Sequence, residues 1–481
     1  MATVLCRQSA LTNRAMPNAV ALLVLALWPF VVIALHGRLS TDRALILSLL
    51  VGYMFLPEYP TQFDLPLLPA LNKHNIPALT AFVVTLWRSG RQTPLLPESR
   101  PGRVLLVVFI LTPIMTVLTN GETVFYGQVG LPAMGLKELI SLPLQQFFLI
   151  VPFLLARQHL AHGSAQRELL KALVVGALVY SLFMLAEIRL SPQMNQWVYG
   201  FYQHSFAQTL RGGGYRPVVF MYHGIWVAFF VMTAIVAAWA LWRQAYGGAR
   251  FQLQLIALYL MVILVLAKSL GALLFMLLLV PLVVLVPNRL QVKIALVIGV
   301  FALSYPLMKG LGIFPTERLT GLANSFDPAR AQSLQFRFDN ENTLLTRALH
   351  KPFFGWGSWG RNHVLDSISG RVLTITDGRW VITIGVYGWI GFLAEFGLLV
   401  LPLFLLWQES RHTNDIQVSP FVGALSLILA INVLDLLPNA TLTPLTWLVA
   451  GMLTGYAEEL RRMRLKTQRP TQQGLAWKSV M

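Results

Sequence analysis

The sequence predicts an all-α, polytopic integral membrane protein with about 12 transmembrane helices and one large periplasmic loop, at about 310–380, that contains short helices. Two observations lead to this prediction. The 481 residues are 56% hydrophobic and only 12% charged, whereas soluble domains carry about twice that share of charge. Apolar runs close to spanning length also recur along the whole chain, which excludes a soluble domain with a single anchor.

About twelve segments have the apolarity and the flanking charge of membrane spans. The apolar piece 76–87 is too short to cross, so we expect a re-entrant or interfacial segment there, covered by protein. Residues 1–460 are expected to form a single transmembrane domain, and residues 461–481 a basic cytoplasmic tail. The expected spans lie near 17–36, 43–56, 103–119, 138–156, 168–190, 217–242, 250–267, 269–286, 291–309, 382–407, 418–436 and 440–457.

Basic residues set the expected orientation. A formal net charge of +17 would favour nucleic acid as the partner of a soluble protein, but here much of it lies in short loops and in the tail, as the positive-inside rule describes. The N- and C-termini are then cytoplasmic, and loops 191–215 and 310–380 face outward. Both of these outer loops contain arginines, for which the binding of an anion is the simplest reason. Cys6 is the single cysteine, so an internal disulfide or cysteine metal cluster is not expected.

The segment RGGGYRP, which contains Arg211 and Arg216, ends the outer loop 191–215 and opens the expected sixth span. A guanidinium at this boundary can make bidentate contacts with phosphate, or it can pair with lipid headgroups. Tyr222 and His223 lie about two turns into the same expected span, where the histidine either packs or takes part in chemistry. Lys268, in an outer hairpin, either snorkels to the interface or faces the same anion.

The large loop supplies a second group of candidates. Arg337 and Arg347 lie at helical spacing in RFDNENTLLTRAL, which predicts a short amphipathic helix that either binds an anion or forms a solvated face with ion pairs. The turn KPFFGWGSWG follows, and its proline and glycines end the helix. Trp356 and Trp359 in this turn either stack on sugar rings or are interfacial aromatics.

Asp377 and Arg379 immediately precede the expected tenth span. A carboxylate at the outer mouth is placed where a general base is needed, although a salt bridge with a neighbouring arginine is an equal alternative. Arg379 and His363 are candidates for substrate binding, and His363 or Glu341 would take the role of the base if Asp377 does not. No metal cluster stands out in the sequence, so a metal site is not expected.

Several segments together resemble the O-antigen ligase and O-antigen polymerase superfamily of bacterial membrane glycosyltransferases. They are LPLLPALNKHNIP with Lys73, RPVVFMYHG from Arg216, KSLGALL from Lys268, RFDNENTLLTRALHKPFFGWGSWG from Arg337, and then TDGRW and YGWIGFLAEFG. Twelve spans with one large outer loop before the tenth are also similar to that family.

The resemblance implies transfer of a glycan from undecaprenyl diphosphate to an acceptor hydroxyl at the periplasmic face of the inner membrane, without a nucleotide sugar, metal or other cofactor. Arg216 would match the family's arginine at the start of the sixth span, and Arg337 the arginine of its large loop; together with Asp377 they are the three expected catalytic residues. The family's histidine before the tenth span is replaced by Asp377-Gly378. The implied partners are the lipid-linked oligosaccharide, an acceptor glycan or lipid A-core, the bilayer, and flippase and chain-length or export proteins, with no nucleic acid.

Three functions stay open at this point. Polymerisation of exopolysaccharide or O-antigen repeat units is the favoured prediction, and ligation of the glycan to lipid A-core is the alternative within the class. A polysaccharide or small-molecule transporter is the alternative from another class, although such transporters often show two related halves with a central loop, whereas here the large loop comes late in the chain.

Overall fold

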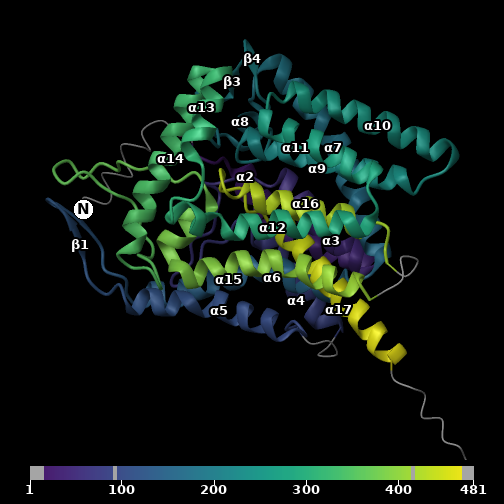
Figure 1. The fold of residues 1–481 in the computed structure, drawn as a ribbon, viewed down its shortest axis with the longest axis horizontal. Coiled ribbons are helices and arrows are strands. Elements are labelled where there is room, and N and C mark those ends of the chain that lie inside the picture. The colour runs from purple at the N-terminus through teal and green to yellow at the C-terminus, as the bar shows by residue number, and fades with distance from the viewer. Residues whose placement is uncertain (1–15, 90–94, 413–417, 469–481) are drawn as a thin grey trace, which may run out of the picture.

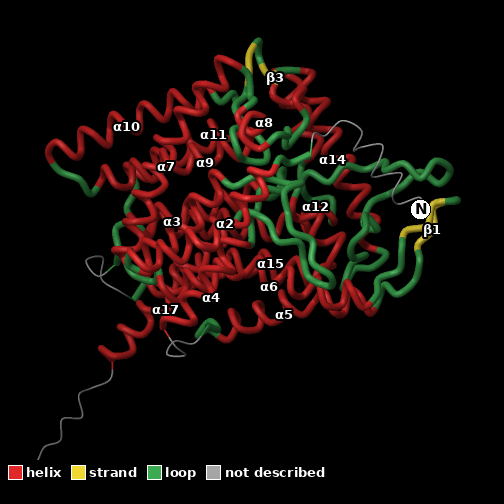
Figure 2. Tube along the Cα trace, turned by 180° about the vertical axis from the view of Figure 1, so that it is seen from behind, coloured by secondary structure: helices red, strands yellow, loops and turns green. Residues whose placement is uncertain are grey.

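The computed structural model describes residues 16–89, 95–412 and 418–468. The chain is mostly helical, and the strands of the described part form two short hairpins, β1–β2 (Val124–Tyr126, Val129–Leu131) and β3–β4 (Leu210–Arg211, Gly214–Tyr215). The β1–β2 hairpin and helix α14 lie at one end of the molecule, and the last turns of α17 lie at the opposite end (Figure 1). Seen from behind, loops gather at the end that carries β1 and α14 (Figure 2).

Eight described helices are long and apolar enough to cross a membrane, as the fold class predicts for a multi-pass membrane protein. They are α2 (Ala19–Arg38), α5 (Arg100–Leu118), α6 (Leu136–His159), α7 (Gly163–Leu190), α9 (Gly224–Arg243), α10 (Gly247–Leu266), α12 (Asn288–Gly310) and α15 (Arg379–Ser410).

The other four expected spans also coincide with helices, three of them shorter than 18 residues. These four are α3 (Thr41–Phe55), α11 (Leu270–Leu285), α16 (Val422–Asp435) and α17 (Pro444–Gln468). The remaining helices are α4 (Ile76–Ser89), α8 (Met194–Tyr199), the 3₁₀ turn η1 (Phe206–Thr209), α13 (Thr316–Phe326) and α14 (Pro328–Leu349). The large loop therefore contains helices, as expected, and the apolar piece 76–87 lies in the short helix α4, whose re-entrant or interfacial position stays a prediction.

The helices differ in how much of their surface other helices cover. Most residues of α9 are buried, and its alanine-rich stretch allows close packing against α7, α10 and α11. In contrast, α2 and α10 leave large apolar side chains exposed, among them Leu23, Phe30, Phe251 and Val262. Exposed apolar bands of this kind are what a lipid-facing helix presents, since lipid covers them at no cost.

Helix α15 is broken at Gly388, where the backbone has φ 69° and ψ −173°. The turn after α14 docks into this break through backbone bonds: the N–H groups of Trp356 and Gly357 donate to the carbonyls of Gly385 and Val386, at 2.8 and 2.9 Å. A Cβ on Gly388 would lie 2.2 Å from the carbonyl oxygen of Phe353, so only glycine fits. The freed backbone groups are thus satisfied by the loop, as irregular backbone at membrane depth requires.

The expected start of the sixth span was wrong. The expectation placed it at 217, but helix α9 begins at Gly224, and the segment before it is irregular, with Val219 at φ 54°. The physical reason is a carboxylate that no local pattern reveals: Glu187 accepts the backbone N–H groups of Val218 and Val219, both at 2.8 Å. These bonds take the place of helical ones and hold the segment outside the helix.

The basic tail also differs from the expectation in its first part. Residues 461–468 continue α17 as helix, and Arg462 and Arg464 pair with Glu98 and Glu409 rather than extending freely. Residues 469–481 and Cys6 lie outside the described residues.

Candidate functional site

A cavity beside the large loop brings two of the three expected catalytic residues together. Arg337 on α14 and Asp377 just before α15 both line it, and its volume is about 230 Å³. Most of the rest of the wall is apolar, and its side chains come from α11, α12, α14, α15 and α16 and from the segments before α13, before α15 and after α16. They are Phe275, Phe301, Phe314, Leu334, Phe338, Ile375, Val381, Leu434, Leu437 and Pro438. We call this space the Arg337–Asp377 cavity.

The Nε atom of Arg337 lies 3.6 Å from Oδ2 of Asp377. Both side chains are partly exposed, at 39% and 44%, so water reaches the pair and a ligand could take the place of either partner. Glu341, one turn further along α14, also lines the cavity and accepts a 2.9 Å hydrogen bond from the Tyr305 hydroxyl. Burial raises the pKa of Glu341 despite this bond and the nearby Lys309 ammonium. The cavity therefore combines a guanidinium with two carboxylates in different environments.

A second and larger cavity, of about 470 Å³, lies on the other side of the start of α15. We call it the central cavity. Val381 faces the first cavity, whereas Arg379, Ile382 and Thr383 line the second. The first turns of α15 thus form a wall between the two spaces, and only Gly378 separates Asp377 on one side from Arg379 on the other. The two expected site residues at this position do not share one cavity.

The charge of Arg379 is already compensated. Its Nε and Nη2 atoms donate to Oε1 and Oε2 of Glu395, each at 2.7 Å, and Glu395 is fully buried. A bidentate pair of this kind fixes the guanidinium geometry. Arg379 can contact a neutral ligand in the central cavity, but it has little free charge to offer to a phosphate.

Arg216 is buried, with 5% of its surface exposed, at the N-terminal end of α9. Its Nη2 donates to the Ser269 hydroxyl at 3.1 Å, and its buried Nε has no partner among the described residues. Burial, and after it the nearby charge of Arg211, lower the pKa of Arg216 to about 10, so it stays protonated at neutral pH. Gly224 permits this position, because a Cβ there would lie 2.7 Å from the arginine Cδ.

A buried guanidinium without a carboxylate partner is costly unless an anion approaches it. Among the described residues, no carboxylate lies within ion-pair distance of Arg216. However, Arg216 is not among the residues that line the Arg337–Asp377 cavity or the central cavity. The structure therefore does not bring Arg216 into one pocket with Arg337.

His223 caps α9, and its Nδ1 accepts the N–H of Ile225 at 3.1 Å. Burial, and next the charge of Arg216, lower the pKa of His223 to about 3, so its ring is neutral at physiological pH. The expectation that Tyr222 and His223 lie inside the span was wrong, since both precede α9, where Tyr222 is 37% exposed. His223 is a capping group that cannot add positive charge beside Arg216.

Lys268 is engaged by the backbone of the β3–β4 hairpin. Its Nζ atom donates to the carbonyls of Arg211 and Gly212, at 2.8 and 3.3 Å. The side chain therefore neither snorkels outward nor stays free for an anion. The Arg211 side chain itself is exposed at the hairpin.

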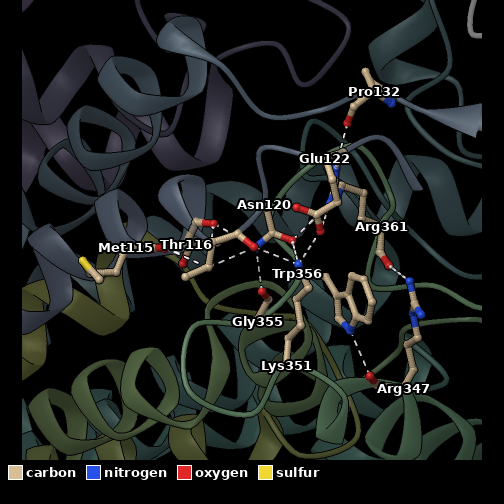
Figure 3. A network of polar contacts seen from close by, with 11 residues as sticks. Met115, Thr116, Asn120, Glu122, Pro132, Arg347, Lys351, Gly355, Trp356 and Arg361 are labelled. Carbon is tan, nitrogen blue, oxygen red and sulfur yellow. Dashed lines mark hydrogen bonds and ion pairs between the residues drawn. The ribbon is translucent and has the colours of Figure 1, made fainter.

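The large loop is anchored on the end of α5 through Asn120, which is fully buried (Figure 3). The Asn120 amide donates to the carbonyl of Gly355 at 2.9 Å. Its Oδ1 atom accepts bonds from Lys351 Nζ at 2.9 Å and Arg361 Nη2 at 3.1 Å. Glu122, two residues further on, pairs with the same two cations. One short segment therefore fixes three points of the loop.

Arg347 and Trp356 belong to this anchored part and contact each other. The guanidinium carbon of Arg347 lies 3.3 Å from the centre of the Trp356 ring, and the indole N–H donates to the Arg347 carbonyl at 2.8 Å. Trp356 is only 8% exposed, so its ring faces protein rather than an open site. This cation–π contact favours a structural role for both residues.

Trp359 and His363 lie further along the same turn and are not among the residues that line the two cavities. Trp359 is 44% exposed, so its ring is open to a ligand or to lipid. His363 lies 3.2 Å, through Nδ1, from both the carbonyl and the hydroxyl oxygen of Thr374. Burial lowers the pKa of His363, so the imidazole is less basic than usual.

Apart from Arg379, sequence reasoning missed the residues that line the central cavity. His74 lines it, and its Nε2 lies 3.2 Å from Oε2 of the buried Glu58, which also pairs with Lys73 at 3.1 Å. Burial alone would raise the pKa of Glu58, but the charges of Lys73 and His74 prevail and lower it to about 2. The signal was available, since this proline-rich stretch holds polar residues next to an apolar helix, but nothing local indicates which of them face a cavity.

The eight long apolar helices indicate a multi-pass membrane protein. Its buried charged side chains and the break in α15 form the candidate polar sites described above. No known family model matches the chain, and no curated protein matches it either. Within the described part of the chain, no group of three or more His, Cys, Asp or Glu could hold a metal ion. The expected metal independence stays a prediction.

Proposed function

We propose that this protein is a membrane glycosyltransferase that moves a glycan from a polyprenyl diphosphate carrier to the hydroxyl of an acceptor sugar, most directly in the polymerisation of surface-polysaccharide repeat units. The observation that carries the proposal is the Arg337–Asp377 cavity. A guanidinium and carboxylates line a cavity whose other walls are mostly phenylalanine and aliphatic side chains. Such a space suits a ligand with an apolar tail and an anionic head.

The guanidinium of Arg337 would bind the diphosphate. Its present contact with Asp377 is long and exposed to solvent, and such pairs contribute little, about 0–1 kcal/mol. A phosphate oxygen can therefore displace the carboxylate at small cost. Charge-assisted bonds to a phosphate are stronger, and preorganised guanidinium groups stabilise the charge that develops on a departing diphosphate.

The reaction is a substitution at the anomeric carbon of the donor glycan. The acceptor hydroxyl oxygen forms the new bond to that carbon, while the bond from the carbon to the phosphate oxygen breaks and its electron pair stays on the lipid diphosphate. The hydroxyl proton passes to a carboxylate, for which Asp377 is the first candidate and Glu341 the second. Arg337 neutralises the charge of the leaving group.

Arg216 is proposed to hold the anionic carrier as it approaches. Its burial at the start of α9 without a carboxylate partner supports this role, since helix N-termini favour anions. Arg216 and Arg337 do not line one pocket in this structure, so the proposal requires that the carrier spans the distance between them or that the loop moves.

The setting of this reaction is also a proposal. Twelve crossings, cytoplasmic termini and a large loop at the periplasmic face of an inner membrane are supported by the charge distribution and by helices at all twelve expected positions. Cysteine labelling of residue 360 from the outside of intact cells tests the orientation. Labelling from the cytoplasmic side alone would contradict it.

Lipid analysis of a strain that lacks the gene tests the function. A polymerase predicts that single repeat units accumulate on the lipid carrier, and a ligase to lipid A-core predicts that long chains accumulate on it instead. Lipid-linked glycans identical to those of the parent strain would overturn both and favour a transporter.

A further inference from the structure

The central cavity has a lining that the chemistry of the Arg337–Asp377 cavity does not use. Polar side chains come to it from the segment before α4, from α6, from the large loop and from α15, and Trp226 from α9 adds an aromatic ring. They include the amides of Asn72, Asn75, Gln145 and Gln146 and the hydroxyls of Ser358, Thr383 and Tyr387. Its volume of about 470 Å³ falls in the range of small-molecule sites, about 300–1,000 Å³.

The charged side chains at this cavity are paired with carboxylates of residues that do not line it. Arg379, the guanidinium among its described lining residues, is paired in bidentate fashion with Glu395. His74 contacts Glu58, which in turn pairs with Lys73 at 3.1 Å. A phosphate or carboxylate ligand would therefore meet no free counter-charge here, and it would be desolvated without compensation.

Amides and hydroxyls remain as the groups that can recognise a ligand. An amide has both a donor and an acceptor, and so does a hydroxyl, which matches a ligand rich in hydroxyl groups. The amides of Asn72 and Asn75 are partly engaged by the local backbone, so the glutamine amides of α6 and the hydroxyls carry most of this recognition. Trp226 supplies an aromatic surface at the edge of the cavity, and its ring contacts those of His74 and Tyr53 at centroid distances of 5.9 and 6.3 Å. An uncharged saccharide fits this combination of groups.

We propose that the central cavity binds an uncharged saccharide, the acceptor glycan whose hydroxyl receives the transferred chain. This inference rests on the proposed function, because it places the acceptor opposite the donor. Asp377 and Arg379 face the two cavities from either side of Gly378, so donor and acceptor would meet at the N-terminal end of α15. A Cβ on Gly378 would lie 2.1 Å from the Leu437 carbonyl oxygen, so only a glycine fits between Asp377 and Arg379.

Saccharide binding to the full chain in lipid nanodiscs tests the proposal. The probes are methyl glycosides of glucose, galactose, mannose, rhamnose and N-acetylglucosamine, with methyl glucuronide as the charged comparison, and the readout is saturation-transfer NMR with titration. At least one uncharged glycoside is expected to bind better than the glucuronide. Gln145→Ala should weaken that binding about 2- to 10-fold, as the loss of one hydrogen bond does.

Two further variants make the result specific. Leu442 lines the cavity, so Leu442→Trp places a large ring in it and should abolish binding. In contrast, Gln335→Ala, at an exposed glutamine on α14, should leave binding unchanged. If none of the uncharged glycosides binds, or if Leu442→Trp binds as well as the parent while its melting temperature is unchanged, the proposal is overturned.

Failure of this inference can be told apart from failure of the proposed function. Arg337→Ala should keep saccharide binding, because Arg337 lines the other cavity. Saccharide binding together with normal polymer in Arg337→Ala cells would overturn the proposed donor site and leave the central cavity as a sugar site. Loss of polymer in those cells without any saccharide binding would overturn the central cavity alone.

Discussion

Replacing Arg337 separates the function of its cavity from the stability of the fold. The contact with Asp377 has a length of 3.6 Å between side chains that are 39% and 44% exposed, so its loss should cost about 0–1 kcal/mol of unfolding free energy. In contrast, one charge-assisted bond to a departing diphosphate contributes about 1.5–3 kcal/mol. At about 1.36 kcal/mol per factor of ten, Arg337→Ala should slow glycan transfer about 10- to 150-fold.

The assay compares polymer in a gene-deletion strain that expresses each variant with the abundance and melting temperature of the purified protein. Arg337→Lys should recover only part of the activity, because an ammonium cannot make a bidentate contact. Arg318→Ala is the matched control, since Arg318 is an exposed arginine on α13 of the same loop. Wild-type polymer in Arg337→Ala, or a loss of polymer that follows loss of folded protein, would refute the reasoning.

Three further predictions concern residues whose environments the structure defines. Arg216→Met should leave the melting temperature equal or higher, because it removes a buried charge without a carboxylate partner. The same variant should strongly reduce the amount of polymer. A marked drop in its melting temperature would indicate a structural role instead. Trp356→Ala should lower the free energy of unfolding of the purified protein by about 3–5 kcal/mol in denaturant titrations. Trp359→Ala, at a position that is 44% exposed, should change it little. Equal effects of the two substitutions would contradict the anchoring of the loop. The pKa of His223 is lowered to about 3 by burial, so protonation favours the unfolded state and stability falls as the pH drops below about 6.5. His223→Asn, which keeps a cap acceptor, should therefore lose less melting temperature than the parent between about pH 7.5 and about pH 5, and an equal loss would show that this ring does not titrate in that way.

The helical positions could be predicted because membrane spans leave a strong local pattern. Apolar length and flanking charge place all twelve expected segments on helices, and the helical spacing of Arg337 and Arg347 predicts α14. The local pattern could not predict where α9 begins, because Glu187 on helix α7 accepts hydrogen bonds from the backbone just before α9. Long-range bonds of this kind have no signature in the local sequence.

The candidate site was predictable only in part for the same reason. Asp377 could be placed near an arginine, and the structure pairs it with Arg337. The glycines of the FFGWG turn were expected to form a turn, but their docking into the break at Gly388 depends on two segments meeting in space. The ion pair of Arg379 with Glu395 could not be predicted either, because the two residues lie sixteen positions apart in the chain, on either side of the break in α15.

The most direct test of the central claim is native mass spectrometry of the purified protein with added undecaprenyl diphosphate. We expect the parent and Arg318→Ala to retain the diphosphate lipid as a bound adduct, and Arg337→Ala to retain much less of it. Equal retention by Arg337→Ala and the parent would contradict the assignment of this cavity to a lipid diphosphate.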